Sequence, residues 1–154
     1  MEKYIGTKII EAEPAFYCKD GGGNTAVALT RDAADTYPDV REGYRVRYQD
    51  GYESWSPKDV FEAAYRRTDS MSFGLAIEAA KAGHKIQREG WNGKGQYVEL
   101  ATCISYKNAS GEVVNVNHDA IGNAALAFVG TSGVQLGWLA SQADMLADDW
   151  RIVE

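Results

Sequence analysis

The segment from Arg88 to Leu100 constrains the fold of this chain more than any other stretch. It reads REGWNGKGQYVEL, so its first eight residues hold three glycines, one tryptophan, one asparagine and two cations. Glycine adopts positive φ angles and allows close backbone approach at little steric cost. The residues from Tyr97 onward alternate like a strand, as do those from His84 to Arg88. The pattern therefore predicts a tight loop that joins two strands.

The same loop has two functional interpretations. Successive backbone N–H groups in a glycine-rich turn form a nest that binds anions. Trp91 offers a flat face for a base, and Lys94 offers a mobile positive charge, so the first interpretation is a site for a nucleotide-like ligand. The second is a hairpin loop whose tryptophan packs into the core. Residue types alone leave both interpretations open.

The first part of the chain, residues 1–67, predicts a small module with a hairpin and a helix. Asp50-Gly51 is a type I′ turn signal between two alternating runs. Ser56 is the expected N-cap of a following helix, with Pro57 at its first position and a buried stripe that begins at Val60. No motif in this part has a chemical role that the residues reveal.

A second module is predicted from residue 71 to residue 154. Its helix begins after Ser72 and ends at Gly83, the expected left-handed cap. Further along, we expect a strand from Gln96 to Ser105, a turn at residues 108–111, a short helical piece from Asn117 to Leu126 and a closing strand from Trp150 to Val153. The fold class expected for the whole chain is α+β, with small antiparallel sheets, short helices and two small modules.

Composition excludes several classes of function. The chain is 45% apolar and 25% charged, as in soluble globular proteins. Its net charge of −6 and lack of a basic stripe argue against binding to long nucleic acid. It has no apolar run of about 18 residues and no signal peptide, so no membrane association is expected. Two cysteines and two histidines show no metal-ligand spacing, so we expect no metal and no cofactor.

Three blocks in the second module carry a resemblance to a known family. They are a helix (MSFGLAIEAAKAG, from Met71), the glycine loop from Arg88, and WLASQADMLADDW, from Trp138. In this order and spacing they resemble the Thoeris anti-defense 2 family of phage proteins. The resemblance implies a molecular sponge that binds cyclic nucleotide immune signals, such as cyclised ADP-ribose, without chemistry. It also implies a homotetramer with pockets at subunit contacts, located in the cytoplasm of the infected bacterial host.

The resemblance and the residue types together give a hypothesis for the site. The residues assigned to ligand binding are Arg88, Trp91, Asn92, Gly93, Lys94, Gly95, Tyr97, Trp138, Ser141, Gln142 and Asp144. The aromatic members would stack on a base or wall the pocket, the residues from 92 to 95 would cradle phosphate or ribose, and the arginine would neutralise a phosphate. The three polar residues near the C-terminus would bind hydroxyls or base edges. Ser141 and Asp144 also fit a helix capping box, which is a purely structural role.

An enzyme is the less favoured class for this sequence. An enzyme requires a poised acid, base, nucleophile or metal, and no such signature appears. A binder requires only stacking rings, backbone donors and amide side chains, which the chain concentrates. Two alternatives remain: a phage structural or adaptor module in which Trp91 and Trp138 are core residues, and a hydrolase of the same signals.

Overall fold

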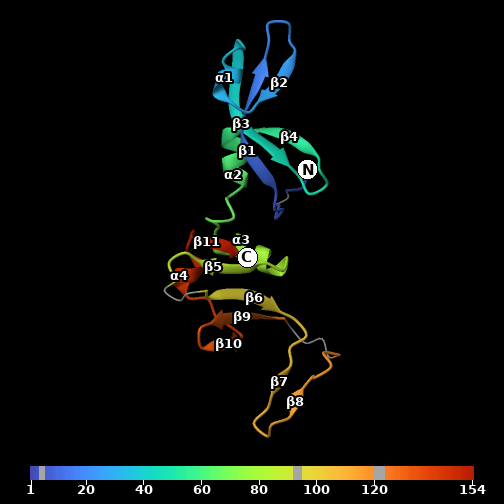
Figure 1. Ribbon diagram of the computed structural model, residues 1–154, viewed down its shortest axis with the longest axis vertical. Helices are drawn as coiled ribbons and strands as arrows, with labels where there is room; N and C mark the ends of the chain where they lie inside the picture. Colours follow the sequence, from blue (N-terminus) through green and yellow to red (C-terminus); the bar gives the residue numbers. More distant parts are fainter. Residues whose placement is uncertain (4–5, 92–94, 120–123) are drawn as a thin grey trace. The chain divides into compact units, whose positions relative to one another are not determined.

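The computed structural model describes residues 1–3, 6–91, 95–119 and 124–154. The chain divides into two compact units, Met1–Arg66 and Arg67–Glu154. The predicted fold class is confirmed, because the chain combines small antiparallel sheets with short helices (Figure 1). Among the described residues, no helix has the length and apolar content needed to cross a membrane.

The first unit is a four-stranded antiparallel sheet with two short helices. Its elements in chain order are β1 (Glu11–Lys19), β2 (Thr25–Ala28), α1 (Arg31–Ala34), β3 (Asp39–Arg47), β4 (Glu53–Pro57) and α2 (Lys58–Ala64). The strands stand in the order β2-β1-β3-β4. Pro14 lies in β1, where only β3 is a neighbour, because β2 pairs with β1 from Phe16 onward. The proline thus occupies an edge-like part of its strand, as expected for a residue without an N–H.

The hairpin predicted around Asp50-Gly51 is confirmed as β3 and β4, but its turn is not of type I′, because that type needs a positive φ at both central residues and Asp50 does not have one. Gly51 has a φ of +83°, and the Tyr48 amide donates to the Tyr52 carbonyl at 2.9 Å to close the turn. Glutamates on the neighbouring strands pair with the arginines of β3, including Glu53, whose carboxylate lies 2.8 Å from the Arg47 Nε. The arginines on this face therefore form ion pairs between neighbouring strands of the sheet.

The expected start of the helix that follows was wrong by one residue, and so was part of its buried stripe. Strand β4 continues through Pro57, which becomes the N-cap of α2 with an extended ψ of 145°, and Ser56 stays in the sheet opposite Tyr44. Val60 is exposed rather than buried. Phe61, the next residue of the predicted stripe, does pack against the sheet, with its ring stacked 4.2 Å from that of Tyr44.

The second unit is built on a five-stranded antiparallel sheet. Its elements in chain order are α3 (Phe73–Lys81), β5 (Lys85–Arg88), β6 (Tyr97–Ala101), β7 (Tyr106–Lys107), β8 (Val113–Val114), β9 (Ala125–Gly130), β10 (Gly133–Leu136), α4 (Gln142–Met145) and β11 (Trp150–Val153). The main sheet has the order β10-β9-β6-β5-β11, and β7 pairs with β8 in a separate hairpin (Figure 1). The last strand of the chain thus lies beside β5, not beside its predecessor in sequence.

One face of this sheet carries the core of the unit. Ile86, Val98 and Trp150 are fully buried there against the small residues of α3. The predicted helix is confirmed, and Gly83 follows it with a φ of +97°. Ser72 occupies the N-cap position, although its side chain makes no capping hydrogen bond. Close packing against α3 depends on the alanines that face the sheet.

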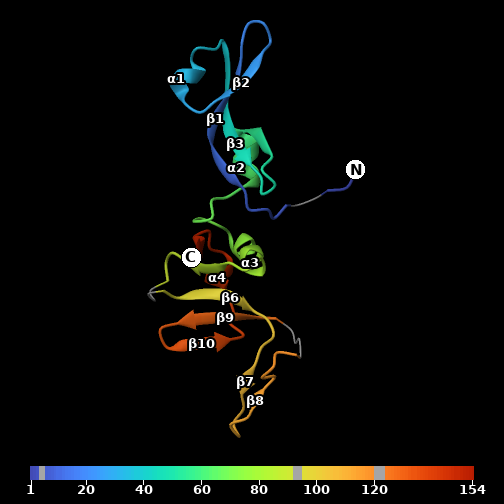
Figure 2. The same cartoon turned by 45° about the vertical axis from the view of Figure 1, so that its right-hand side comes forward.

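The opposite face of the sheet divides into a polar half and an apolar half. Because side chains alternate along a strand, the neighbours of Ile86 along β5 face the other way, and they are Lys85 and Gln87. Tyr97 and Arg151 share this face through the register of β6 and β11. On β9 and β10 the same face carries only apolar side chains, such as Val134 beside Val129. Figure 2 shows β10 at the outer edge of the sheet, beyond β9.

Two other expectations for this unit need correction. The strand predicted from Gln96 to Ser105 ends at Ala101, because Cys103 has a positive φ of 52° that an extended strand does not accommodate. A helical piece was expected from Asn117 to Leu126, but Leu126 belongs to strand β9. Residues 120–123 of that stretch lie outside the described part. The turn predicted at 108–111 is confirmed between β7 and β8.

Candidate functional site

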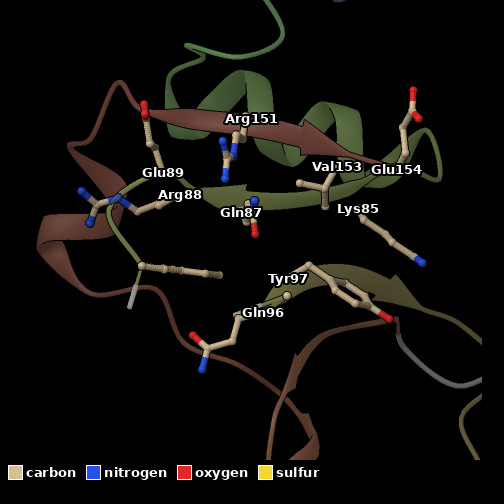
Figure 3. A pocket seen from close by; sticks show the side chains of 11 residues that line it. Lys85, Gln87, Arg88, Glu89, Gln96, Tyr97, Arg151, Val153 and Glu154 are labelled. Carbon is tan, nitrogen blue, oxygen red and sulfur yellow. The ribbon is translucent and has the colours of Figure 1, made fainter. Parts of the chain in front are cut away.

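A cavity of about 350 Å³ opens on the polar half of the sheet face that lies opposite the core, called the open face below. Strands β5, β6 and β11 and the start of the glycine loop form its walls (Figure 3). The lining residues are Lys85, Gln87, Arg88, Glu89, Trp91, Gly95, Gln96, Tyr97, Arg151, Val153 and Glu154. This volume lies within the range of roughly 300–1,000 Å³ typical of small-molecule sites.

The floor of the cavity is a row of side chains across three strands. Gln87 stands at its centre, between Arg151 on β11 and the backbone of β6 (Figure 3). With its amide oriented to match its neighbours, Gln87 accepts from the Arg151 guanidinium through its oxygen at 2.7 and 2.9 Å and donates from its nitrogen to the Gln96 carbonyl at 2.6 Å. Gln87 thereby fixes the arginine in the floor of the cavity.

A lysine and a tyrosine form the side of the cavity on the neighbouring strands. The Lys85 ammonium lies 4.8 Å from the centre of the Tyr97 ring, which is a cation–π contact. Two carboxylates, those of Glu89 and Glu154, belong to the rim, and both point away from Tyr97 in Figure 3. The floor and side thus combine two positive charges with an aromatic face.

Trp91 belongs to an aromatic cluster as well as to the cavity wall. Its ring makes edge contacts with those of Phe128 at 5.5 Å, Trp138 at 5.9 Å and Trp150 at 5.4 Å. Trp150 is fully buried, and the other members pack against the core around it. The tryptophan at 91 therefore holds the start of the glycine loop against the core while its remaining surface lines the cavity.

The guanidinium of Arg88 is held by two carboxylates of the C-terminal segment. Its Nε donates to Asp149 Oδ1 at 2.8 Å, and its Nη1 donates to Asp144 Oδ1 at 3.1 Å. The arginine side chain is 21% exposed. The charge of Arg88 is thus already neutralised, and the side chain ties the loop to the segment around α4.

Asp144 forms hydrogen bonds with several parts of this unit. Its Oδ2 accepts from the Ser141 hydroxyl at 2.7 Å and from the Ser141 amide at 3.0 Å, which completes the predicted capping box of α4. Its Oδ1 lies 3.5 Å from the Trp91 indole nitrogen, and its carbonyl accepts from the Trp150 indole at 2.9 Å. One residue therefore connects the cap, the loop and the core.

The structure divides the residues assigned to ligand binding from the sequence into three groups. Those that line the cavity are Arg88, Trp91, Gly95 and Tyr97. Those outside its lining are Trp138, Ser141, Gln142 and Asp144. Asn92, Gly93 and Lys94 lie outside the described residues. The lining also includes side chains that the sequence motifs did not indicate, above all Lys85, Gln87 and Arg151. Alternation within the two predicted strands was the available signal, but it does not reveal that those strands are neighbours.

The carboxylates that hold Arg88 have lowered pKa values. Hydrogen bonds from Arg88 lower the pKa of Asp149 below its ordinary value of 3.8, against the opposing effect of burial. Burial raises the pKa of Asp144, but hydrogen bonds from Ser141, Arg88 and Trp91 outweigh it, and the net direction is downward. Both groups are therefore ionised in the folded protein at neutral pH.

These lowered pKa values predict a loss of stability in acid. A carboxylate with a lower pKa in the folded state stabilises the protein above its unfolded pKa, near 3.8, and that contribution disappears as the pH falls through the folded value. We expect the free energy of unfolding to decrease below about pH 4, and to decrease less steeply in Asp149→Asn. Urea unfolding at several pH values, followed by tryptophan fluorescence, measures both slopes. Equal slopes for the two proteins would contradict this role of Asp149.

No cluster of metal-ligating side chains occurs in the part of the chain that the structure describes. His118, one of the two histidines, places its Nδ1 2.6 Å from the Cys103 carbonyl and so helps to close the base of the β7–β8 hairpin. Cys18 is buried in the first unit.

Comparison with known proteins identifies the family. Residues 71–153, which include every strand around the cavity, match the Thoeris anti-defense 2-like domain. The chain belongs to the Thoeris anti-defense 2-like family. A relative named Thoeris anti-defense 2, from Bacillus phage SP01, is 38% identical over 88 residues, which cover 54% of this chain and 94% of that protein. Family membership supports a phage anti-defence role and confirms the resemblance carried by the three sequence blocks.

Proposed function

We propose that the protein binds cyclic nucleotide immune signals, such as glycocyclic ADP-ribose, and sequesters them without cleavage, so that Thoeris effectors are not activated. The observation that carries the proposal is the pairing of two cations with aromatic and amide groups in one cavity, on a domain of an anti-defence family. Lys85 and Arg151 supply the positive charge, and Tyr97 supplies an aromatic face.

The lining chemistry fits a doubly charged ligand that also carries a base and ribose hydroxyls. Two cations balance the charge of a pyrophosphate, and hydrogen bonds between charged groups are stronger than those between neutral groups. The amides of Gln87 and Gln96 supply donors and acceptors for hydroxyls and base edges. The Tyr97 ring, already in contact with Lys85, supplies a stacking surface. Every group in this assignment binds, and none has to exchange a proton.

The site that we propose differs from the set assigned by sequence in its source of charge. Arg88 already neutralises two aspartates, so a second anion gains little from it. Lys85 contacts a neutral ring, and Arg151 bonds to a neutral amide, so both keep a net charge for a ligand. We therefore assign phosphate binding to these two residues rather than to Arg88.

We further propose that the protein acts as a homotetramer in the cytoplasm of the infected host. A sponge must retain its ligand at nanomolar concentration, which corresponds to about −12 kcal/mol of binding free energy. A cavity that lies open on a sheet face buries only part of such a ligand, and a second subunit would enclose more of it. Enclosure of this kind raises affinity without any new chemistry.

Retention of an intact ligand tests the function. Purified protein is incubated with cyclic ADP-ribose isomers, free ligand is removed, the protein is heat-denatured, and the released molecule is identified by mass spectrometry. We expect near-stoichiometric recovery of unchanged ligand. Recovery of a hydrolysed product would reject sequestration in favour of an enzyme, and failure to retain any isomer would reject this class of ligand.

A further inference from the structure

Strand β10 is an open edge of the five-stranded sheet. It pairs with β9 on one side and has no strand on the other among the described residues. All four of its residues are exposed, including Val134 at 66% and Leu136 at 43%. An exposed edge presents unpaired N–H and C=O groups that readily pair with another strand.

The opposite edge of the same sheet is covered by the chain itself. The Met71 amide donates to the Trp150 carbonyl at 2.7 Å, and the Trp150 amide donates to the Met71 carbonyl at 3.1 Å. The Ile152 amide also donates to the Thr68 carbonyl at 2.9 Å. The segment before α3 therefore satisfies the outer side of β11, whereas no segment within the described ranges covers the outer side of β10 in this way.

Protective features that normally prevent pairing are missing from β10. Proteins protect open edges with charged side chains, proline or bulges. In the first unit, the open part of β1 carries Glu11, Glu13 and Pro14. By contrast, β10 reads Gly-Val-Gln-Leu and pairs with β9 in continuous register. No charged residue occurs anywhere in the sequence between Asp119 and Asp144.

We infer that β10 is a homotypic interface, at which the edge of one chain pairs antiparallel with the same edge of a second copy around a two-fold axis. Such an isologous contact is self-complementary, because each copy presents the same groups to the other. It extends the sheet across the two copies and brings the Val134 and Leu136 side chains of both copies onto one face, so that the apolar half of the open face continues from one copy into the other.

Charge favours a second copy as the occupant of this edge. Each chain carries a net charge of −6, so two copies repel each other wherever their carboxylates meet. The uncharged stretch around β10 is where they approach without that cost. A charged peptide would find no complementary side chain on β10 itself. This inference deepens the proposed homotetramer by naming one of its contacts, and it does not depend on the ligand.

The test compares the mass in solution of the full chain and its variants by light scattering after gel filtration. We expect the wild type to be oligomeric, and Val134→Lys to raise the dissociation constant at least about 100-fold, because each copy would bring an ammonium group into an uncharged contact close to the axis. Leu136→Lys is a second variant with the same expectation. Val60→Lys, on the exposed surface of α2, is the control and should keep the wild-type mass.

Hydrogen exchange on the wild type tests the interface without a substitution, so it remains informative if a lysine variant misfolds. We expect the amides of β10 to be protected in the wild type at high concentration and to lose protection on dilution. A monomeric wild type, or lysine variants that fold and keep the oligomeric mass, would overturn the inference. An oligomer that depends on Val134 but retains no cyclic ADP-ribose would support this interface while rejecting the proposed function.

Discussion

Arg88→Met is expected to lower the free energy of unfolding of the second unit by about 2–3 kcal/mol, because hydrogen bonds to charged groups contribute roughly 1.5–3 kcal/mol each. The variant removes the donor that Asp144 and Asp149 share and leaves the two carboxylates without a counter-charge. The loss is limited by their partial exposure, 14% and 33% for the two side chains. Urea unfolding followed by tryptophan fluorescence measures it.

The matched control for this prediction is Arg47→Met in the first unit. Arg47 also pairs with carboxylates, but its side chain is 53% exposed, and surface pairs of this kind contribute roughly 0–1 kcal/mol. If Arg88 braces the loop, its replacement destabilises the protein clearly more than replacement of Arg47. Equal, small effects would indicate that Arg88 is free for another role, such as the phosphate contact expected from the sequence.

The double variant Lys85→Met with Arg151→Met is expected to weaken binding of cyclic ADP-ribose isomers by at least about 100-fold, since each charged hydrogen bond contributes roughly 1.5–3 kcal/mol. Methionine keeps much of the side-chain length and removes the charge. Both residues lie on the open face, away from the core, so the melting temperature should change little. Isothermal titration calorimetry measures the affinity.

Lys81→Met is the control for the double variant. Lys81 lies at the end of α3, pairs with Glu78 at 2.8 Å and does not line the cavity. Its replacement removes a positive charge from the same unit without touching the proposed site. If the affinity of the double variant lies within about threefold of wild type, a difference of less than 1 kcal/mol, then Lys85 and Arg151 do not bind the ligand's phosphates.

Local features of the fold followed from local signals in the sequence. The turn at Asp50-Gly51 and the capping box of Ser141 and Asp144 depend on residues within a few positions of one another. Turn and cap chemistry acts over such distances, so composition and spacing are enough to predict it. The exact start of α2 was missed because pairing with Tyr44 keeps Ser56 in the sheet, which is a tertiary effect.

The composition of the cavity depended on contacts that spacing does not reveal. Arg151 and Gln87 become neighbours only because the last strand pairs with β5. Both strands were expected from the sequence, but the order of strands in a sheet is set by packing of the whole unit. The same holds for Arg88, whose partner Asp149 is 61 positions further along the chain. The sequence therefore identified the loop beside the cavity but not the residues, Lys85 and Arg151, whose positive charge is available to a ligand.

The position of Trp91 is compatible with both initial interpretations of the glycine loop. Its ring packs against Phe128, Trp138 and Trp150, as a core residue would. It also lines the cavity, as a binding residue would. Residue type alone does not separate these roles, because a large amphipathic ring suits both.

A crystal structure of the protein with a bound cyclic ADP-ribose isomer tests the central claim most directly. We predict an intact ligand on the open sheet face, with its phosphates between Lys85 and Arg151, its base against Tyr97, and Arg88 still bonded to Asp149. A ligand bound elsewhere on the chain, or one whose phosphates take Arg88 away from its aspartates, would contradict the account.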